Sequence, residues 1–427
     1  MLPCGAGWAG SKKCSCEGLR LLFLVFRRQL VFPLLVRYAW LASLPAHKIS
    51  AMKKARNLIS LTASLTLFLF CAAYSLIDAA AVAPQVFKAK QAAEAKSFAF
   101  IASREEILAK AKGEGKLEVL TFLEADSRKT MIEAFKKKYP FIQEVAAESI
   151  GGTDAYQRFI LEMKAGRSRA WDTVHISNQV YNEYPPYLKK LDILGMAEQG
   201  VLDIPAPVID PNNRNIVSKG TQVAVAAYNN KRISADQVPT TWEGFLKPEF
   251  KGRKFVVDTR PLAVANLVPS WGLEKTVDFA KKIAEQQPVW VRGSHTLASV
   301  AAGDYAIYMG LNLSSVIEAK AKDLTKSLEL QLLDPVPVRF GSADGVFGLA
   351  PHPHAALLWL EFQVSREGQE ILDKYGPADG SVFVSGSMQH SMIRGRRLSS
   401  LTWDLQVDLD QWVKKIVEAY GFPTAEK

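Results

Sequence analysis

The chain has 427 residues, 48% of them hydrophobic and 22% charged, which is the composition of a globular protein with room for more than one domain. Its formal net charge is +10. However, ten Lys or Arg and only two acidic residues lie in residues 1–81, which leaves 43 basic and 41 acidic residues in the remainder. The body of the protein is therefore almost neutral, which argues against a nucleic-acid partner.

All four cysteines also precede residue 82. This excludes disulfides, thiolate metal sites and cysteine nucleophiles from the body of the protein.

Residues 52–81 have the order of a secretory signal peptide. A short basic region precedes the uncharged run Leu58–Ile77, and small residues follow up to Ala81, after which cleavage is expected. A run of this length is also compatible with an uncleaved N-terminal anchor. Residues 1–51 hold an apolar stretch interrupted by arginines and are interpreted as a doubtful N-terminal extension, with a second membrane-associated segment as the alternative. We expect the body to be exported to the periplasm.

The first half of the body alternates strands and helices. Residues 82–115 form a lead-in that ends in a short helix, "REEILAKAKGEGK". Then come the strand "KLEVLTFL", the helix "RKTMIEAFKKKYP", the strand "FIQEVAAES", the helix "AYQRFILEMKAGR" and the strand "WDTVHIS". Short connections between these elements predict parallel β–α–β units in an open sheet covered by helices.

The second half repeats this logic. Strands are expected at Gln222–Asn230, Arg253–Pro261 and Tyr305–Met309, with the amphipathic helix "TVDFAKKIAEQQ" between the last two. Residues 330–350 contain two extended runs, and His354–Leu372 reads as one long helix. The sequence therefore predicts two α/β lobes, each with its own sheet.

Ligands of open α/β sheets bind beyond the carboxyl ends of the strands, where the connecting loops gather. In the first lobe these loops are "TFLEADS", "SIGGTD" and "HISNQ", which offer the candidate ligand residues Thr121, Ser149, Gly152, Thr153, Ser177 and Asn178. The alternative for "SIGGTD" is that Thr153 or Asp154 only caps the helix that follows. A Walker-type phosphate loop is excluded, because no Gly-Lys-Ser/Thr follows.

On the facing lobe, Asp258 and Arg260 end a predicted strand. Arg260 is the candidate for a carboxylate, phosphonate or similar anion, because its planar fork binds such groups bidentately. The alternative is a surface or inter-lobe salt bridge.

Tyr228, at the end of the crossing strand, either stacks on a solute or fills the core. His175 is more often a hydrogen-bonded structural residue than a ligand.

Four collinear segments resemble the extracellular solute-binding proteins of bacterial ABC importers, in the branch often labelled iron(III)-type. They are "GKLEVLTFLE…MIEAFKKKYPFI", "AYQRFILEMKAGRSRAWDTVHIS", "TTWEGFLKPEFKGR" and "APHPHAALLWLEFQVSREGQEIL". The resemblance implies a two-lobed clamshell of type II with crossing hinge strands, and delivery of a captured solute to an inner-membrane ABC permease. It also implies that Asn312 faces the cleft.

One departure from the family bears on which solute the protein binds. Ferric-binding members carry paired tyrosines just after the strand that here reads "YAIYMGLNLSSV", and this chain has Asn312, Leu313, Ser314 and Ser315 in that region. Fe³⁺ prefers anionic oxygen ligands, so direct ferric binding is disfavoured. His352 and His354 have no third ligand at suitable spacing, so we expect no metal centre there.

The sequence thus predicts a periplasmic, monomeric binding protein without cofactor or catalysis. It captures a small polar or anionic solute between lobe 1 (116–224 and about 335–385) and lobe 2 (225–334 and about 386–427). Alternatives are a ferric-ion-binding importer component with non-standard ligands, a tethered sensor, and a periplasmic hydrolase or transferase. The last lacks support, because Gly-x-Ser-x-Gly and His-Glu-x-x-His motifs are absent.

Overall fold

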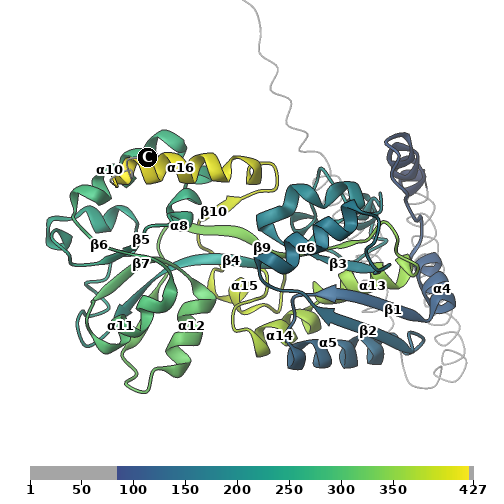
Figure 1. The fold of residues 1–427 in the computed structure, drawn as a ribbon, viewed down its shortest axis with the longest axis horizontal. Coiled ribbons are helices and arrows are strands. Elements are labelled where there is room, and N and C mark those ends of the chain that lie inside the picture. The colour runs from purple at the N-terminus through teal and green to yellow at the C-terminus, as the bar shows by residue number, and fades with distance from the viewer. Residues whose placement is uncertain (1–83, 423–427) are drawn as a thin grey trace, which may run out of the picture. The chain divides into compact units, whose positions relative to one another are not determined.

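Two long strands, β4 (Ile216–Asn229) and β9 (Val336–Val346), run through the middle of one mixed sheet (Figure 1). The structure is a computed structural model that describes residues 84–422, which belong to one compact unit of the chain. The strand order is β2-β1-β3-β9-β4-β7-β5-β6, with β10 (Leu398–Leu401) paired to β9 and β8 (Leu328–Gln331) paired to β4. Helices cover the sheet, so the predicted α/β class with an open sheet is confirmed.

We call lobe 1 the part built on β1 (Lys116–Thr121), β2 (Glu144–Ser149) and β3 (Thr173–Ile176), which run parallel as predicted. Apolar faces of its helices bury residues such as Phe135 and Trp359 against the sheet. These helices come from both ends of the body: α4 (Arg104–Glu114), α5 (Ala125–Lys138), α6 (Thr153–Lys164), α7 (Ile193–Glu198), α13 (Pro353–Gln363) and α14 (Arg366–Tyr375).

We call lobe 2 the part built on β5 (Val256–Asp258), β6 (Val289–Val291) and β7 (Ile307–Asn312), which run parallel to one another, whereas β7 is antiparallel to β4. Helices α10 and α16 pack against each other on this lobe (Figure 1). Its helices are α8 (Leu262–Ala265), α9 (Val268–Trp271), α10 (Leu273–Glu285), α11 (Leu297–Ala302), α12 (Leu313–Lys322) and α16 (Leu409–Tyr420). A short helix, α15 (Met388–Met392), precedes β10. The residue boundaries of the lobes given by the sequence stay a prediction.

Strand β4 connects the lobes, since it pairs with β9 over its first part and with β7 and β8 over its second. The register with β9 shifts on both sides of Gly220. A Cβ atom at Gly220 would lie 2.3 Å from the backbone oxygen of Asp379, so only glycine fits at this irregularity. A bulge with a glycine is a natural point for the strand to bend.

The segment His354–Leu372 is not one long helix, so that prediction is wrong. It forms α13 and α14, which separate at Val364 and Ser365. Ser365 is the N-cap of α14, and its side chain accepts a hydrogen bond from Gly368 N. A Cβ at Gly368 would lie 2.2 Å from the backbone oxygen of Phe362, so the break depends on close packing that helical periodicity does not encode.

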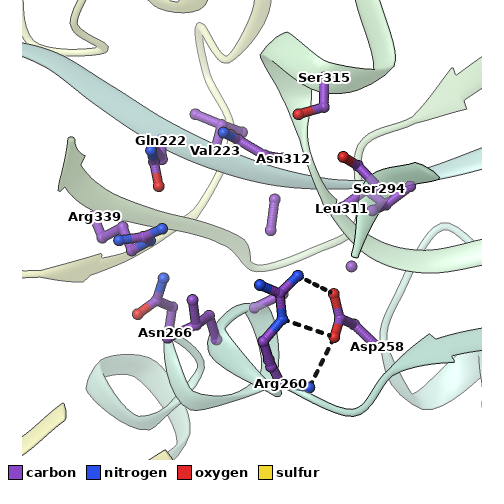
Figure 2. A pocket seen from close by; sticks show the side chains of 14 residues that line it. Gln222, Val223, Asp258, Arg260, Asn266, Ser294, Leu311, Asn312, Ser315 and Arg339 are labelled. Carbon is purple, nitrogen blue, oxygen red and sulfur yellow. Dashed lines mark hydrogen bonds and ion pairs between the residues drawn. The ribbon is translucent and has the colours of Figure 1, made fainter. Parts of the chain in front are cut away.

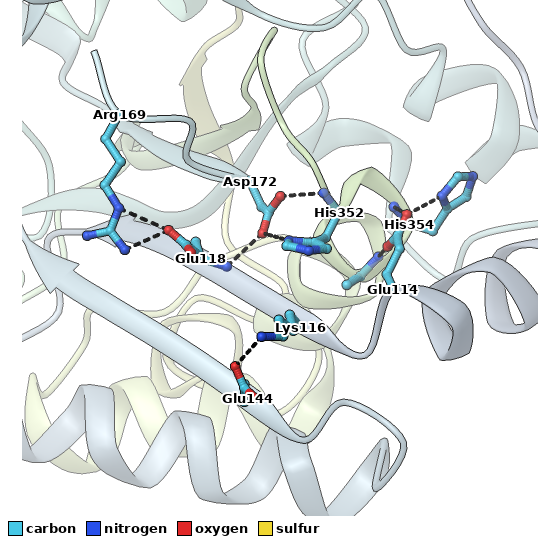
Figure 3. A network of polar contacts seen from close by, with 9 residues as sticks. Glu114, Lys116, Glu118, Glu144, Arg169, Asp172, His352 and His354 are labelled. Atoms are coloured by element: carbon cyan, nitrogen blue, oxygen red, sulfur yellow. Dashed lines mark hydrogen bonds and ion pairs between the residues drawn. The ribbon is translucent and has the colours of Figure 1, made fainter. Parts of the chain in front are cut away.

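Carboxylates from two other segments hold the start of α13 (Figure 3). Asp172, just before β3, accepts hydrogen bonds from His352 N at 2.6 Å and from His352 Nδ1 at 2.9 Å. Glu114, the last residue of α4, accepts from Ala355 N at 2.7 Å and from His354 N at 3.2 Å. Proline at position 353 has no N–H, so the free donors of this helix start are satisfied.

We expect Glu114→Ala to lower the free energy of unfolding by about 1–2 kcal/mol, because it leaves two backbone N–H groups at the start of a buried helix without acceptors. Urea denaturation followed by circular dichroism measures the change. The control is Glu144→Ala, which removes only an exposed ion pair with Lys116 and should cost under about 0.5 kcal/mol. Equal losses in the two variants would contradict the capping role of Glu114.

None of the helices within residues 84–422 is both long and apolar enough to cross a membrane. The predicted signal peptide or anchor at 52–81, and the extension at 1–51, lie outside the described residues.

Candidate functional site

A pocket of about 250 Å³ lies where β4 and β9 meet lobe 2 (Figure 2). Three residues singled out from the sequence, Asp258, Arg260 and Asn312, line it together. The full lining comes from the two crossing strands and from the segments at the ends of β5 and β7: Gln222, Val223, Ala224, Asp258, Arg260, Leu262, Ala263, Asn266, Ser294, Gly310, Leu311, Asn312, Ser315 and Arg339.

Glycine at position 310 lets β7 pass close to α8 at this pocket. Its φ is +80°, which disfavours other residues, and a Cβ there would lie 2.9 Å from the Cβ of Ala263. The pocket wall therefore depends on this glycine.

Arg260 forms an ion pair with Asp258 at one wall of the pocket (Figure 2). The Asp258 carboxylate accepts from Arg260 N at 2.8 Å, Nε at 3.4 Å and Nη2 at 3.2 Å, and also from Gly293 N at 3.1 Å. The hydrogen bond to Asp258 raises the pKa of Arg260. The positive charge of Arg260 is thus already matched within its own loop, and its side chain is about half exposed.

Arg339 has no such counter-ion. It extends from β9 into the pocket opposite Arg260, and its guanidinium forms no hydrogen bond or ion pair within residues 84–422 (Figure 2). Burial alone lowers the pKa of Arg339 to about 10, so the group is still charged at neutral pH. A largely buried cation without a partner is costly, and it is the group in this pocket that most requires an anion.

Amide and hydroxyl groups complete the polar lining. Asn312 is the N-cap residue of α12, but its side chain makes no capping hydrogen bond, so the amide is available to a ligand. Asn266 Oδ1 and Gln222 Oε1 are buried and accept no hydrogen bond within the described part of the chain. Ser294 and Ser315 add hydroxyl groups.

The predicted residues of lobe 1 do not line this pocket. Thr121, the last residue of β1, is fully buried and accepts a hydrogen bond from Leu123 N at 3.4 Å. Ser149 ends β2 and is exposed, as are Gly152 and Thr153 at the start of α6. Gly152, with φ of +82°, occupies the N-cap position of α6, so the expectation that Thr153 or Asp154 caps this helix is wrong.

Two further predicted residues, Ser177 and Tyr228, also lie outside the pocket. Ser177 follows β3 and is buried, and Asn178 begins the 3-10 helix η3 (Asn178–Glu183). Tyr228 lies in β4, is 7% exposed and packs in the core of lobe 2, which favours the core-filling alternative.

His175 belongs to a buried charge cluster beside the crossing strands. Asp344, directly across from it on β9, accepts from His175 Nδ1 at 3.0 Å and also pairs with Lys219 of β4. Each of the three side chains is at most 6% exposed. Burial, with the Lys219 charge in addition, lowers the pKa of His175, so it is neutral at pH 7 and a structural member of the cluster.

The described residues offer no ready metal site. No group of three or more His, Cys, Asp or Glu in residues 84–422 could hold a metal ion. Tyr308 is buried in β7, and its hydroxyl donates to the backbone oxygen of Gly293 at 3.1 Å rather than facing the pocket. Burial raises the pKa of Tyr308 well above its usual value, which opposes a phenolate ligand.

Sequence reasoning missed Arg339, Gln222 and Asn266. A signal was present for the first: Arg339 stands between apolar residues in "VPVRF", Val336–Phe340, where a charged residue is unexpected in a buried strand. The register makes Gln222 its direct neighbour across β4 and β9, and that pairing joins residues more than a hundred positions apart.

Residues 186–405, just over half of the chain, match the model of a family described as bacterial extracellular solute-binding protein. The chain belongs to this family. The match covers the whole of lobe 2 up to β10, including every residue that lines the pocket. A comparison with curated proteins finds no match.

Solved structures of other solute-binding proteins share the fold. FutA (IdiA) of Trichodesmium, in complex with iron and citrate, has a TM-score of 0.57 at 17% identity, over 72% of this chain and 100% of its own. Ferric iron-binding protein A of Mannheimia haemolytica in an open conformation has a TM-score of 0.57 at 14% identity, over 72% of this chain and 99% of its own. The Bordetella ferric binding protein has a TM-score of 0.57 at 14% identity, over 72% of this chain and 100% of its own. At such low identity they establish the fold alone.

The resemblance stated from the sequence is therefore confirmed, and so are the two-lobed fold and the role of a solute-binding component of an ABC importer. Members of this family are extracellular or periplasmic transport proteins that bind small solutes and act with ABC permeases.

Proposed function

We propose that this solute-binding protein captures a small anionic solute in the pocket beside β9, with Arg339 as the main anion-binding group. The observation that carries the proposal is the free guanidinium of Arg339 in a polar pocket. Because its planar fork can donate two parallel hydrogen bonds, a carboxylate, phosphate or phosphonate group suits it.

The charges of the lining support an anion over a cation. Asp258 and Arg260 neutralise each other, and Arg339 leaves one positive charge in excess. Bare Fe³⁺ would meet two guanidinium groups and one carboxylate that is already bonded, which disfavours the ferric alternative. FutA of Trichodesmium binds iron together with citrate, so an anionic ferric complex is a useful test ligand here.

We further propose that lobe 1 closes over the solute by bending at β4 and β9. The exposed ends of β2 and α6, with Ser149, Gly152 and Thr153, would then approach the pocket from the other side. This keeps these residues as candidate contacts of the closed form.

The finer statements from the sequence remain part of the proposal. The protein acts as a monomer without catalysis, cofactor or nucleic acid, and its lobes have the boundaries given above. The segment 52–81 is cleaved after Ala81 or retained as an anchor. Mass spectrometry of the N-terminus of the exported protein distinguishes the two, because cleavage leaves a chain that begins at residue 82.

A thermal-shift screen of the purified protein tests the solute class. We expect acetate, citrate, inorganic phosphate or an organic phosphate to raise the midpoint, whereas polyamines and uncharged sugars leave it unchanged. A ligand present at about 100 times its Kd adds about 2.7 kcal/mol of stability, which is readily measured. Ferric chloride and ferric citrate are compared with citrate alone.

Two outcomes would overturn the proposal. Stabilisation by polyamines or uncharged sugars in the absence of any anion effect would exclude an anionic solute. Stabilisation by ferric ion without citrate would establish the ferric alternative instead.

A further inference from the structure

The pocket holds buried hydrogen-bond acceptors next to its free cation. Asn266 is 3% exposed, and its Oδ1 has no donor within residues 84–422; the same holds for the buried Oε1 of Gln222. Both amides lie beside Arg339, one on either side (Figure 2). A buried acceptor that loses water without gaining a donor costs free energy, so a well-matched ligand supplies one.

Both amides are held in place by the fold. The backbone N of Asn266 donates to Leu262 O at 3.1 Å at the end of α8, which fixes its position at the pocket wall. Gln222 pairs with Arg339 across β4 and β9, and a Cβ at Gly341 would lie only 3.1 Å from its Cγ. Acceptors fixed in advance favour one arrangement of donors on the ligand.

We propose that the solute is a hydroxylated anion, whose hydroxyl groups donate to Gln222 and Asn266 while its anionic group binds Arg339. This inference rests on the proposed function and deepens it. Gln222 and Asn266 then determine specificity, since an anion without donors leaves both oxygens unpaired inside the closed site.

Charge favours hydroxyl over ammonium donors. The ionised groups of the lining are Asp258, Arg260 and Arg339, which sum to one positive charge, and the Asp258 carboxylate is occupied by Arg260 and by Gly293 N. An ammonium group placed between Gln222 and Asn266 would lie next to the Arg339 guanidinium and be repelled. A hydroxyl group donates the same hydrogen bond without that repulsion.

Matched sets of ligands test the inference by isothermal titration of the full-length protein. One set is propyl phosphate, glycerol phosphate and 3-aminopropyl phosphate, and the other is propionate, glycerate and β-alanine. Within each set the anionic group and the number of carbon atoms are constant. The hydroxylated member should bind about 10- to 100-fold more tightly than the alkyl member in at least one set. The ammonium-bearing member should gain nothing.

Two variants assign the preference to residues. Asn266→Leu and Gln222→Met keep the approximate shape and remove the acceptor, so each should reduce the ratio of the affinities for the hydroxylated and the alkyl ligand at least threefold. Because an unpaired polar group is replaced by an apolar one, neither should lower the thermal midpoint of the free protein. Having two variants keeps the test valid if one fails to fold.

The outcomes separate the inference from the proposed function. Equal affinity for hydroxylated and alkyl anions would overturn the inference and leave an anionic solute standing. Tighter binding of the ammonium-bearing ligands would overturn the choice of hydroxyl donors. If none of the six ligands binds, both the inference and the proposed anion site are wrong.

Discussion

Replacement of Asp344 with alanine should lower the free energy of unfolding by about 3–5 kcal/mol. The carboxylate of Asp344 is buried and bonds both Lys219 and His175, so its removal leaves an ammonium group inside the protein without a counter-ion. The Phe122 ring lies 5.0 Å from Lys219 Nζ, but an aromatic ring cannot replace a counter-ion. Urea denaturation of the purified variant measures the loss.

Controls distinguish loss of this buried pair from a general effect of removing a carboxylate. Asp278→Ala removes one partner of an exposed ion pair with Lys282 on α10 and should cost under about 0.5 kcal/mol. The double variant Asp344→Ala with Lys219→Met removes both charges and should recover part of the stability. A loss below about 1 kcal/mol in the single variant would show that Lys219 finds another partner or water.

The same cluster should make stability depend on pH. Burial lowers the pKa of His175, so the folded state keeps it neutral while the unfolded chain takes up a proton below about pH 6.5. Burial opposes the charge of Asp344, but Lys219 and His175 outweigh it, and the pKa of Asp344 is lowered. Both shifts therefore stabilise the fold above the unfolded-state pKa values, and this stability is lost as pH falls. Burial, with the Asp344 charge in addition, raises the pKa of Tyr156, so its hydroxyl does not titrate in this range.

Arg339→Met should weaken binding of the anionic solute by about 100-fold or more, because the anion loses its one unpaired cationic partner. Arg260→Met should weaken binding by only about tenfold, since Arg260 is half exposed and already bound to Asp258. Arg339→Lys should recover part of the loss, because it restores the charge but not the two-point hydrogen bonding. Isothermal titration with the anion identified in the ligand screen measures all three.

The thermal stability of the unliganded protein is a second measurement for Arg339→Met, and we expect it not to fall although the affinity does. A buried cation without a partner destabilises the unliganded fold, so Arg339→Met should leave the thermal midpoint unchanged or raise it. A variant that both binds weakly and unfolds more easily would indicate a structural role for Arg339. Unchanged affinity in Arg339→Met would remove it from the site.

The sequence placed part of the site correctly because of one general property of α/β sheets. Asp258, Arg260 and Asn312 come at the carboxyl ends of β5 and β7, where loops of parallel strands gather, and the structure brings them together at one pocket. To apply this rule one needs to know only where each strand ends, and local sequence patterns indicate the strands.

The remaining pocket residues depend on long-range pairing. Arg339 and Gln222 lie within the crossing strands, and they meet only because β4 and β9 pair in one particular register with a shift at Gly220. Thr121 occupies a strand end as predicted, but it is buried there. No local pattern reports which strand-end residues are covered by the next element.

Lobe 1 is built from segments that lie far apart in the sequence, and this affects how the chain folds. Its core joins α5 to α13, where Phe135 and Trp359 lie 5.1 Å apart between ring centroids, although lobe 2 and both crossing strands separate them in sequence. The lobe cannot complete its core until the last quarter of the chain is available, and such distant contacts form slowly. Lobe 1 of a newly made chain therefore cannot complete its core until synthesis is nearly finished.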